Sequence, residues 1–484
     1  METPKLNSNK SFNQEKLVAV GILILFAIFS IYAFKHATIN IDAGYYLTVA
    51  RNLSQGNWPY SGVLVGYTYN YFFLQAIPFW LINTPAYWHF VFLQWIICII
   101  GSMFIFGSLK KIGLPVYANL FVLGFYLLYQ AGFGLFEIGL EPLVTLFFAA
   151  TYFFGMGNRQ GKLTLWHGLA AGICAVEAFF TKQYGIAGIV ALGLTGLVYW
   201  WFHQKQVTGF LGIVLGIFTG IAINLAIVVF IFNVPLPIFL TQIRGGGYGS
   251  HSLLLWINES INWLVKSGAI FFILMLFSSF ITILKLQKKS DLSTFILLSM
   301  LPISMVAMLT LQFYFQGYDH YYQLFAVPLV IIIAFSIKLL NHHDLFNRAA
   351  KSALFIYAAI FSFYFYRSAS AWSVPSKELL VKQIKDQVGS RKTFLFSNTD
   401  LYFSANLNPV NLKRFGLIFP NAAPVDTIAA IINEAEVVIV DTANIQAVTT
   451  AFKELNTMTP IPQGPLLIFF KDKDQNQLAP APIK

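Results

Sequence analysis

A series of long apolar segments separated by short polar loops is the feature that most constrains the fold of this chain. A membrane-spanning helix needs about 20 apolar residues. Only 11% of the 484 residues are charged, whereas a soluble globular protein has about 25%. We therefore expect an α-helical polytopic membrane protein of about eleven spans. The predicted spans are Leu17–Phe34, Trp88–Leu109, Leu114–Gln130, Gly139–Gly155, Leu165–Phe180, Gly185–Trp201, Thr208–Phe232, Gly268–Leu284, Ser293–Phe313, Tyr322–Leu340 and Ala353–Tyr366.

One further apolar segment, Tyr71–Ile82, is too short to span and contains Pro78. Cytoplasmic loops of membrane proteins are enriched in Lys and Arg, and the lysines before Leu17 therefore predict a cytoplasmic N-terminus. If Tyr71–Ile82 does not cross, every predicted cytoplasmic loop contains a basic residue. We therefore expect an interfacial or re-entrant helix here and an extracytoplasmic C-terminus. The basic residues that decide this are Lys110, Lys111, Arg159, Lys162, Lys205, Lys285, Lys288, Lys289, Lys338, Arg348 and Lys351.

The composition changes after the last predicted span. Short strand-like stretches at 393–397, 414–419, 436–441 and 466–471 alternate with helical stretches at 376–388, 426–433 and 444–455. Such alternation predicts a small α/β domain. The expected organisation is a cytoplasmic tail (1–16), a transmembrane domain (17–370) with a first outer loop (35–87), an extracytoplasmic α/β domain (371–474) and a tail (475–484).

The formal net charge of +11 does not indicate nucleic-acid binding. The basic residues form short runs between apolar segments, as in cytoplasmic loops, and do not form a patch. We expect the lipid bilayer as a partner and no nucleic acid. Cys98 and Cys174 both lie inside apolar segments, so a disulfide framework is not expected.

Most acidic residues between Leu17 and Tyr366 fall at the predicted outer face. Their convergence there predicts a polar cavity that opens to the outside, since ionisable groups near membrane depth are costly and commonly functional. The alternative is that outer loops simply collect carboxylates, which oppose translocation little. The residues are Asp42, Glu137, Glu141, Glu177, Glu259 and Asp319.

Asp42 begins a short predicted helix in the first outer loop. Tyr45, Val49 and Leu53 follow at helical spacing and form one apolar stripe, and Gly56 lies just beyond a suitable C-terminus. We expect the stripe to lie in the lipid boundary, which would hold the Asp42 carboxylate at the water edge of the bilayer. The alternative is that Asp42 only caps the helix.

Four stretches, in this order, resemble the GT-C superfamily of membrane glycosyltransferases, especially protein O-mannosyltransferases and bacterial aminoarabinose lipid A transferases. The resemblance covers roughly Leu17 to Leu340 and, more weakly, the outer C-terminal domain. The stretches are Asp42-Ala43-Gly44-Tyr45-Tyr46 through Ala50-Arg51, Gly139-Leu140-Glu141-Pro142-Leu143, Phe180-Thr181-Lys182, and His320-Tyr321-Tyr322 with Pro328. The chain departs from the family at Ala43, where a second acid is usual, and at Gly66–Tyr71, where Lys-Pro-Pro or His-Pro-Pro is frequent.

The resemblance implies a sugar donor linked to polyprenyl phosphate and an acceptor hydroxyl on a glycan, a lipid or a protein, at the outer face. It implies that Asp42 is the general base, its basicity raised by partial desolvation. Glu141, or Glu137 one turn earlier, would orient the acceptor, share the base role or help to hold a divalent metal ion. Either acid is also explained by the helix dipole alone.

The resemblance further implies cationic contacts to the lipid phosphate from Lys182, Arg244 and His320. The loop Gly245–Gly249 offers backbone N–H groups beside Arg244. Alternatively, Lys182 neutralises Glu177, the loop is a linker, and His320 is an interface residue. The expected lining of the substrate cavity is Tyr45, Tyr46, Arg51, Tyr69, Asn70 and Tyr321.

Two other functions compete with an inverting glycosyl transfer. A transporter or flippase of lipid-linked sugars would show repeated halves and polar sites near mid-membrane. The chain has no visible repeat, and its acids lie towards one face. A catalytically inactive scaffold is suggested by Ala43.

Overall fold

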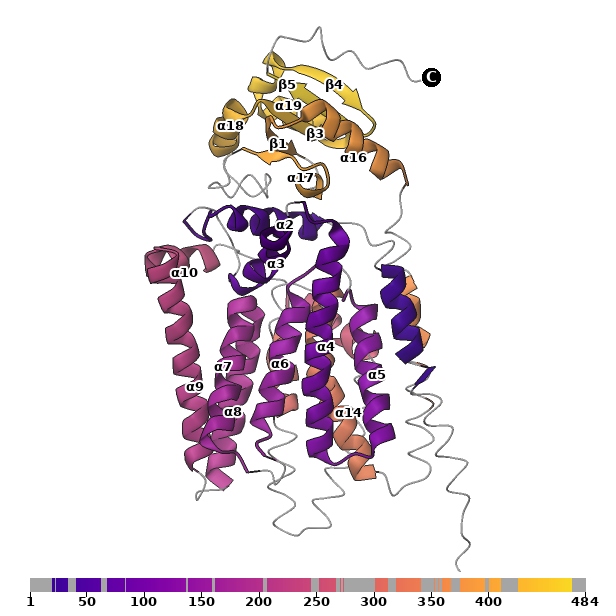
Figure 1. Cartoon of the computed structure of the whole chain (residues 1–484), viewed down its shortest axis with the longest axis vertical. Coiled ribbons are helices and arrows are strands. Elements are labelled where there is room, and N and C mark those ends of the chain that lie inside the picture. Colours follow the sequence, from indigo (N-terminus) through magenta and orange to yellow (C-terminus); the bar gives the residue numbers. More distant parts are fainter. Residues whose placement is uncertain are drawn as a thin grey trace, which may run out of the picture.

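A computed structural model shows a helical bundle with a smaller α/β unit above one end (Figure 1). It describes residues 20–21, 23–33, 41–61, 68–82, 84–135, 138–158, 162–202, 207–244, 252–266, 270, 273, 301–311, 319–340, 352, 356, 359–366, 375–396, 400–410 and 425–471. The helices that precede the C-terminal unit are α2 (Ile41–Ser54), α3 (Asn70–Leu81), α4 (Tyr87–Ile112), α5 (Val116–Gly132), α6 (Glu141–Gly155), α7 (Leu165–Thr181), η1 (Gln183–Gly185), α8 (Ile186–Phe202), α9 (Val207–Ala226), η2 (Ile227–Ile231), α10 (Leu236–Arg244), α11 (Leu253–Lys266), η3 (Asp319–Phe325) and α14 (Ala326–Leu340).

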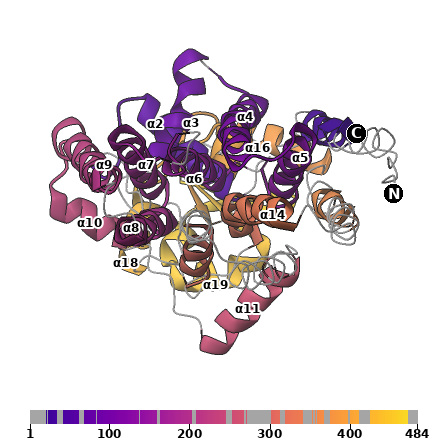
Figure 2. The same ribbon diagram turned by 90° about the horizontal axis from the view of Figure 1, so that it is seen from below.

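The bundle is built from apolar helices that run roughly side by side. Seen from below, α6 lies between α4 and α7, and α5 and α14 lie beside α4 (Figure 2). Within the described residues, three helices are long and apolar enough to cross a membrane, Tyr87–Ile112, Val207–Ile231 and Tyr321–Lys338. Shorter apolar helices, among them Leu23–Ala33 and Leu301–Leu311, accompany them. The chain is therefore a multi-pass helical membrane protein.

The described helices coincide with the predicted spans to within a few residues at most ends. For the predicted span 293–313, residues 301–311 are described, and for 353–366 the description is continuous only over 359–366. The predicted span 268–284 lies almost wholly outside the described residues. The predicted interfacial segment is helix α3, whose 12 residues are too few to cross a bilayer.

Helix ends are set by local chemistry. Gly113, in the left-handed conformation at φ 87°, ends α4, and its N–H donates to the carbonyl oxygens of Leu109 and Lys110. Thr164 precedes α7, and its hydroxyl accepts the His167 N–H. Such capping satisfies backbone groups that the helix itself leaves without partners.

Glycines allow α7 and α9 to pack at very short distance. A Cβ added at Gly172 would lie 2.6 Å from the Ile213 carbonyl oxygen, and one added at Gly216 would lie 2.2 Å from the Leu169 carbonyl oxygen. Small residues are the usual means by which membrane helices bring their backbones together. This packing fixes the relative height of α7 and α9. It therefore also fixes the positions of the side chains at the ends of these helices nearest the C-terminal unit.

The C-terminal unit (residues 375–471) contains a five-stranded sheet of order β2-β1-β3-β5-β4. β1 pairs in parallel with β2 and β3, and β5 is antiparallel to β3 and β4. Its apolar core includes the strand residues Val437–Val440, all buried. The elements are α16 (Pro375–Val388), β1 (Lys392–Phe396), α17 (Asp400–Ser404), β2 (Asn408–Pro409), α18 (Val425–Glu434), β3 (Val437–Asp441), η6 (Thr442–Asn444), α19 (Ile445–Ala451), η7 (Lys453–Thr457), β4 (Thr459–Gln463) and β5 (Leu466–Phe470).

Three of the predicted strands, at 393–397, 436–441 and 466–471, are present as β1, β3 and β5. The predicted strand 414–419 lies outside the described residues. The sequence analysis missed β2, which has only two residues, and β4, which contains Pro460 and Pro462. Prolines are tolerated in β4 because it is an edge strand of the described sheet.

Helix α2 lies across the end of the bundle, beneath the C-terminal unit (Figure 1). The expectation that its apolar stripe lies in lipid is wrong. Tyr45, Val49 and Leu53 are buried inside the protein, in the same apolar cluster as α3 and the C-terminal sheet. The physical reason is that α2 is covered by protein from both sides, so its apolar residues pack against α3 and α17.

Two kinds of contact join the C-terminal unit to the helices below it. The Phe403 ring of α17 makes edge contacts with Phe79 and Phe90, at 6.1 and 5.6 Å between ring centroids. The Arg51 guanidinium of α2 donates to Asn406 Oδ1 and to the Leu407 carbonyl oxygen, both at 2.8 Å. Burial lowers the pKa of Arg51, and the two hydrogen bonds offset part of the cost of burying its charge.

We predict that Gly216→Leu destabilises the protein strongly, since the new side chain must displace the backbone of α7. Overpacking of a core costs about 1–3 kcal/mol. The matched control is Gly193→Leu in α8, because a Cβ there meets nothing within 4 Å. Thermal unfolding in detergent, followed by the monodisperse fraction in size-exclusion chromatography, compares the two. Equal loss in both variants would contradict the packing described for α7 and α9.

Candidate functional site

Glu141 is the first residue of α6 and is only 2% exposed. Pro142 follows within the first turn, where proline's fixed φ suits the start of a helix. A carboxylate in the first turn also interacts favourably with the helix dipole. These features explain why a charged residue is tolerated at the buried start of an apolar helix.

Lys182 lies where α7 ends. Its backbone is extended, with φ −156° and ψ 143°, and the chain then turns into the short helix η1. The Gly185 N–H donates to the Lys182 carbonyl oxygen at 2.8 Å. A Cβ at Gly185 would lie 2.1 Å from the Ala178 carbonyl carbon, so only glycine allows this return of the chain onto α7. The turn holds Lys182 at the protein interior.

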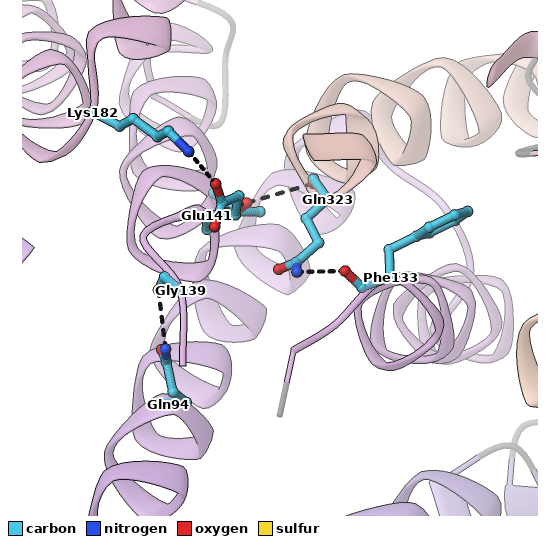
Figure 3. A network of polar contacts seen from close by, with 7 residues as sticks. Gln94, Phe133, Gly139, Glu141, Lys182 and Gln323 are labelled. Carbon is cyan, nitrogen blue, oxygen red and sulfur yellow. Dashed lines mark hydrogen bonds and ion pairs between the residues drawn. The ribbon is translucent and has the colours of Figure 1, made fainter. Parts of the chain in front are cut away.

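Glu141 and Lys182 form a buried ion pair. Lys182 Nζ lies 2.5 Å from Glu141 Oε1, and the two side chains are 3% exposed or less. The ammonium also lies 4.1 Å from the centroid of the Tyr321 ring and 5.4 Å from that of Tyr184. In close-up, the Lys182 side chain extends from the end of α7 to the Glu141 carboxylate (Figure 3). A carboxylate and aromatic faces together compensate for the desolvation of the ammonium group.

Amide side chains extend this polar centre. Gln323, in η3, donates from Nε2 to the Phe133 carbonyl oxygen (Figure 3). The backbone carbonyl oxygen of Gln323 accepts hydrogen bonds from the side chains of Gln130 and Thr145. Gln94 in α4 donates to the Gly139 carbonyl oxygen at 3.0 Å, just before α6. The start of α6 is thus tied to α4, α5 and η3 by hydrogen bonds.

Glu177 is the centre of a second polar cluster, near the C-terminal end of α7. Its carboxylate accepts hydrogen bonds from Asn70 Nδ2 at 2.6 Å and Asn224 Nδ2 at 2.8 Å. The Tyr69 hydroxyl donates to Asn224 Oδ1 at 2.5 Å. Burial, and then the Glu177 charge, raise the pKa of Tyr69, which keeps this hydroxyl protonated. The alternative that Lys182 neutralises Glu177 is therefore wrong, because Lys182 pairs with Glu141.

The residues expected to line a substrate cavity have different surroundings. Tyr45 and Tyr46 are buried among aromatic rings that include Phe72. Arg51 contacts the C-terminal unit and borders the cavity described below.

The other three are placed by the contacts above, with Tyr69 and Asn70 in the Glu177 cluster and Tyr321 against Lys182. Their role towards substrate stays a prediction.

Four further candidates cannot be placed as side chains. For Asp42, Arg244 and His320 the structure describes the helical backbone only, and Glu137 lies outside the described residues. Helix α2 begins at Ile41, so Asp42 is in its first turn. Their catalytic and phosphate-binding roles stay predictions.

The divalent metal ion remains untested. Among the side chains that the structure describes, no group of three or more His, Cys, Asp or Glu residues could hold a metal ion. Glu141, the one predicted ligand in this part of the chain, has its carboxylate engaged by Lys182. A metal ion held by Glu141 or Glu137 therefore stays a prediction, and no step below depends on one.

Several residues of these clusters are not among the residues predicted from the sequence. Gln94, Gln130, Asn224 and Gln323 are buried amides in or beside apolar segments. Their signal was present, since polar residues within membrane helices commonly hydrogen-bond to neighbouring helices. Tyr184, two residues after Lys182, carried no comparable signal.

Comparisons with known proteins identify the fold. Neither the comparison with protein-family models nor that with curated protein sequences found a match. Among solved structures, ArnT from Cupriavidus metallidurans bound to undecaprenyl phosphate matches with a TM-score of 0.66 at 12% identity, covering 95% of this chain and 98% of that one. Its apo state matches with a TM-score of 0.65 at 13% identity over 94% and 98%.

A more distant similarity is to the Archaeoglobus fulgidus oligosaccharyltransferase tethered to an acceptor peptide. The TM-score is 0.50 at 10% identity, and the match covers 90% of this chain and 71% of that one. The predicted resemblance to the GT-C superfamily is confirmed at the level of fold. This chain shares the fold of these GT-C proteins over nearly its whole length.

We predict that Glu141→Gln and Lys182→Met each destabilise the protein by about 3–5 kcal/mol, because each removes the ion-pair partner of a buried charge. The double variant Glu141→Gln/Lys182→Met should regain much of the lost stability. Thermal unfolding of the four proteins in the same detergent measures the coupling. If the effects of the two single variants simply add in the double variant, the ion pair does not stabilise this junction.

Proposed function

We propose that this protein is a membrane glycosyltransferase that moves a sugar from a polyprenyl-phosphate donor to an acceptor hydroxyl at the outer face. The observation that carries the proposal is the fold match over almost the whole of both chains with a structure that binds undecaprenyl phosphate. The buried Glu141–Lys182 pair supports it, because a cation held at the end of a membrane helix is suited to a lipid phosphate.

The proposed orientation places the C-terminal unit outside the cell. Lys110 and Lys111 end α4 at the side of the bundle far from that unit, and Lys338 lies close to Gly113 at the same side. A concentration of Lys residues at one side marks the cytoplasmic face. In this orientation α2 and the outer ends of α6 and α7 lie at the extracytoplasmic surface.

In the proposed reaction Asp42 accepts the proton of the acceptor hydroxyl. The hydroxyl oxygen forms a bond to the anomeric carbon as the bond from that carbon to the phosphate oxygen breaks. The polyprenyl phosphate leaves with the electron pair of the broken bond. Attack from the face opposite the leaving phosphate inverts the anomeric configuration, as the GT-C resemblance implies.

Lys182 is the described cation that we assign to the leaving phosphate. Glu141 keeps it oriented, and the Tyr321 ring, whose centroid lies 4.1 Å from the ammonium, adds a cation–π contact. As negative charge develops on the phosphate, a cation already desolvated and fixed interacts more strongly than a hydrated one. Arg244 and His320 are proposed as further phosphate contacts. No observation in the described structure specifically favours transport over transfer.

We predict that Asp42→Asn lowers transfer by about 10²- to 10⁴-fold, the usual contribution of a general base, while insertion and thermal stability stay unchanged. The matched control is Asp426→Asn, since Asp426 is exposed on α18 of the C-terminal unit. The measurement is mass spectrometry of the cell envelope from strains that express each variant, which also identifies the sugar and the acceptor. Near-normal modification with Asp42→Asn would remove Asp42 from the base role.

A further inference from the structure

A polar cavity of about 470 Å³ lies between α2 and the C-terminal unit. Its volume is within the range of about 300–1,000 Å³ that is usual for ligand pockets. Arg51, Asn52 and Gln55 line it from the last turn of α2 and the residue that follows, and Lys385 and Asp386 line it from the last turn of α16. Asn408 of β2 lies opposite.

The chemistry of the lining indicates a ligand rich in hydroxyl groups. Small-molecule pockets are mostly apolar with a few polar groups, but the side chains named here are amides or charged groups. Amides both donate and accept hydrogen bonds, and each presents these functions in one plane. Adjacent hydroxyls of a sugar match such groups. Two cations against one carboxylate leave a single positive charge, which also permits an acidic sugar.

Part of the lining is held in place and part is open to a ligand. Arg51 is fixed by Asn406, which is held at φ 51° in the left-handed region, and Asn52 donates to the Thr48 carbonyl oxygen. Within the described chain, the side chains of Gln55 and Lys385 make no hydrogen bond or ion pair. A rigid wall with available polar groups beside it is the arrangement that a binding site requires.

The position of the cavity relates it to the proposed chemistry. Arg51 follows Asp42 by nine residues on the same helix, which corresponds to about 14 Å along the axis at 1.5 Å per residue. Nine residues are also about two and a half helical turns, so a bound saccharide must reach partly around α2 for one of its hydroxyls to lie at the Asp42 end. The cavity lies at the last turn of α2, where that helix meets the C-terminal unit.

We propose that this cavity binds the saccharide portion of the acceptor, so that the acceptor is a glycan or glycolipid and not a bare protein hydroxyl. This inference rests on the proposed function. It gives the C-terminal unit a role, because the wall opposite α2 comes from that unit, with Lys385, Asp386 and Asn408 among its polar residues.

The test measures protection of a cysteine placed in the cavity of the full-length protein. Gln55→Cys is labelled with a maleimide in the presence of maltotriose, chitotriose or trigalacturonic acid, with glycerol as the solute control. The matched control is Gln446→Cys, since Gln446 is exposed on α19 and does not line the cavity. Both variants carry Cys98 and Cys174 as the same background.

We expect at least one saccharide to slow labelling of Gln55→Cys about tenfold when its concentration is about ten times its dissociation constant. The same saccharide should not slow labelling of Gln446→Cys, and adding Lys385→Ala or Asn408→Ala should weaken the protection. Protection by none of the three saccharides, or equal protection by glycerol, would overturn the proposal. Protection by undecaprenyl phosphate instead would assign the cavity to the donor.

The readout is independent of transfer. If Asp42→Asn leaves the protection unchanged but also leaves transfer unchanged, the base assignment fails and the saccharide site stands. If protection is absent but Asp42→Asn abolishes transfer, the saccharide site fails and the proposed reaction stands.

Discussion

The buried ion pair between Glu141 and Lys182 is the interaction on which the half of the bundle nearest the C-terminal unit depends. Each charge is at a helix end, one where α6 begins and one where α7 stops. Neither residue could be buried alone, since an isolated charge in a low-dielectric interior is very unfavourable. The pair therefore fixes two helix ends relative to each other, at a distance of 2.5 Å between nitrogen and oxygen.

The surroundings of the pair extend this constraint to other elements. Tyr321 and Gln323 alternate on η3, one facing Lys182 and the other bonding towards α5 and α6. Below, the glycine contacts between α7 and α9 set the height at which Glu177 meets Asn224. Close backbone packing and buried hydrogen bonds thus act together. They hold the ends of α6, α7 and α9 nearest the C-terminal unit in fixed positions beneath α2.

Much of the membrane architecture could be predicted from the sequence. A long apolar segment in lipid folds as a helix, because a helix satisfies all its backbone hydrogen bonds within the segment. The helix at Ile41–Ser54 was also predictable, but its environment was not. An apolar stripe such as Tyr45, Val49 and Leu53 looks the same whether lipid or protein covers it, and here α3 and the C-terminal unit cover it. The edge strand β4, with two prolines, contradicts the usual composition of strands and was missed for that reason.

The candidate site was predictable only in part. The sequence predicts functional roles for Glu141 and Lys182, but it predicts them separately, because sequence spacing does not show that residues 41 positions apart touch. The contact of Arg51 with Asn406, which are 355 positions apart, is of the same kind. Long-range pairing of this sort depends on how the helices pack.

A cryo-electron microscopy structure of the full chain in nanodiscs with undecaprenyl phosphate tests the central claim most directly. We predict that the phosphate lies at the outer ends of α6 and α7, in contact with Lys182, with the Asp42 carboxylate facing the same space. A phosphate bound away from Lys182, with Asp42 directed elsewhere, would contradict the account.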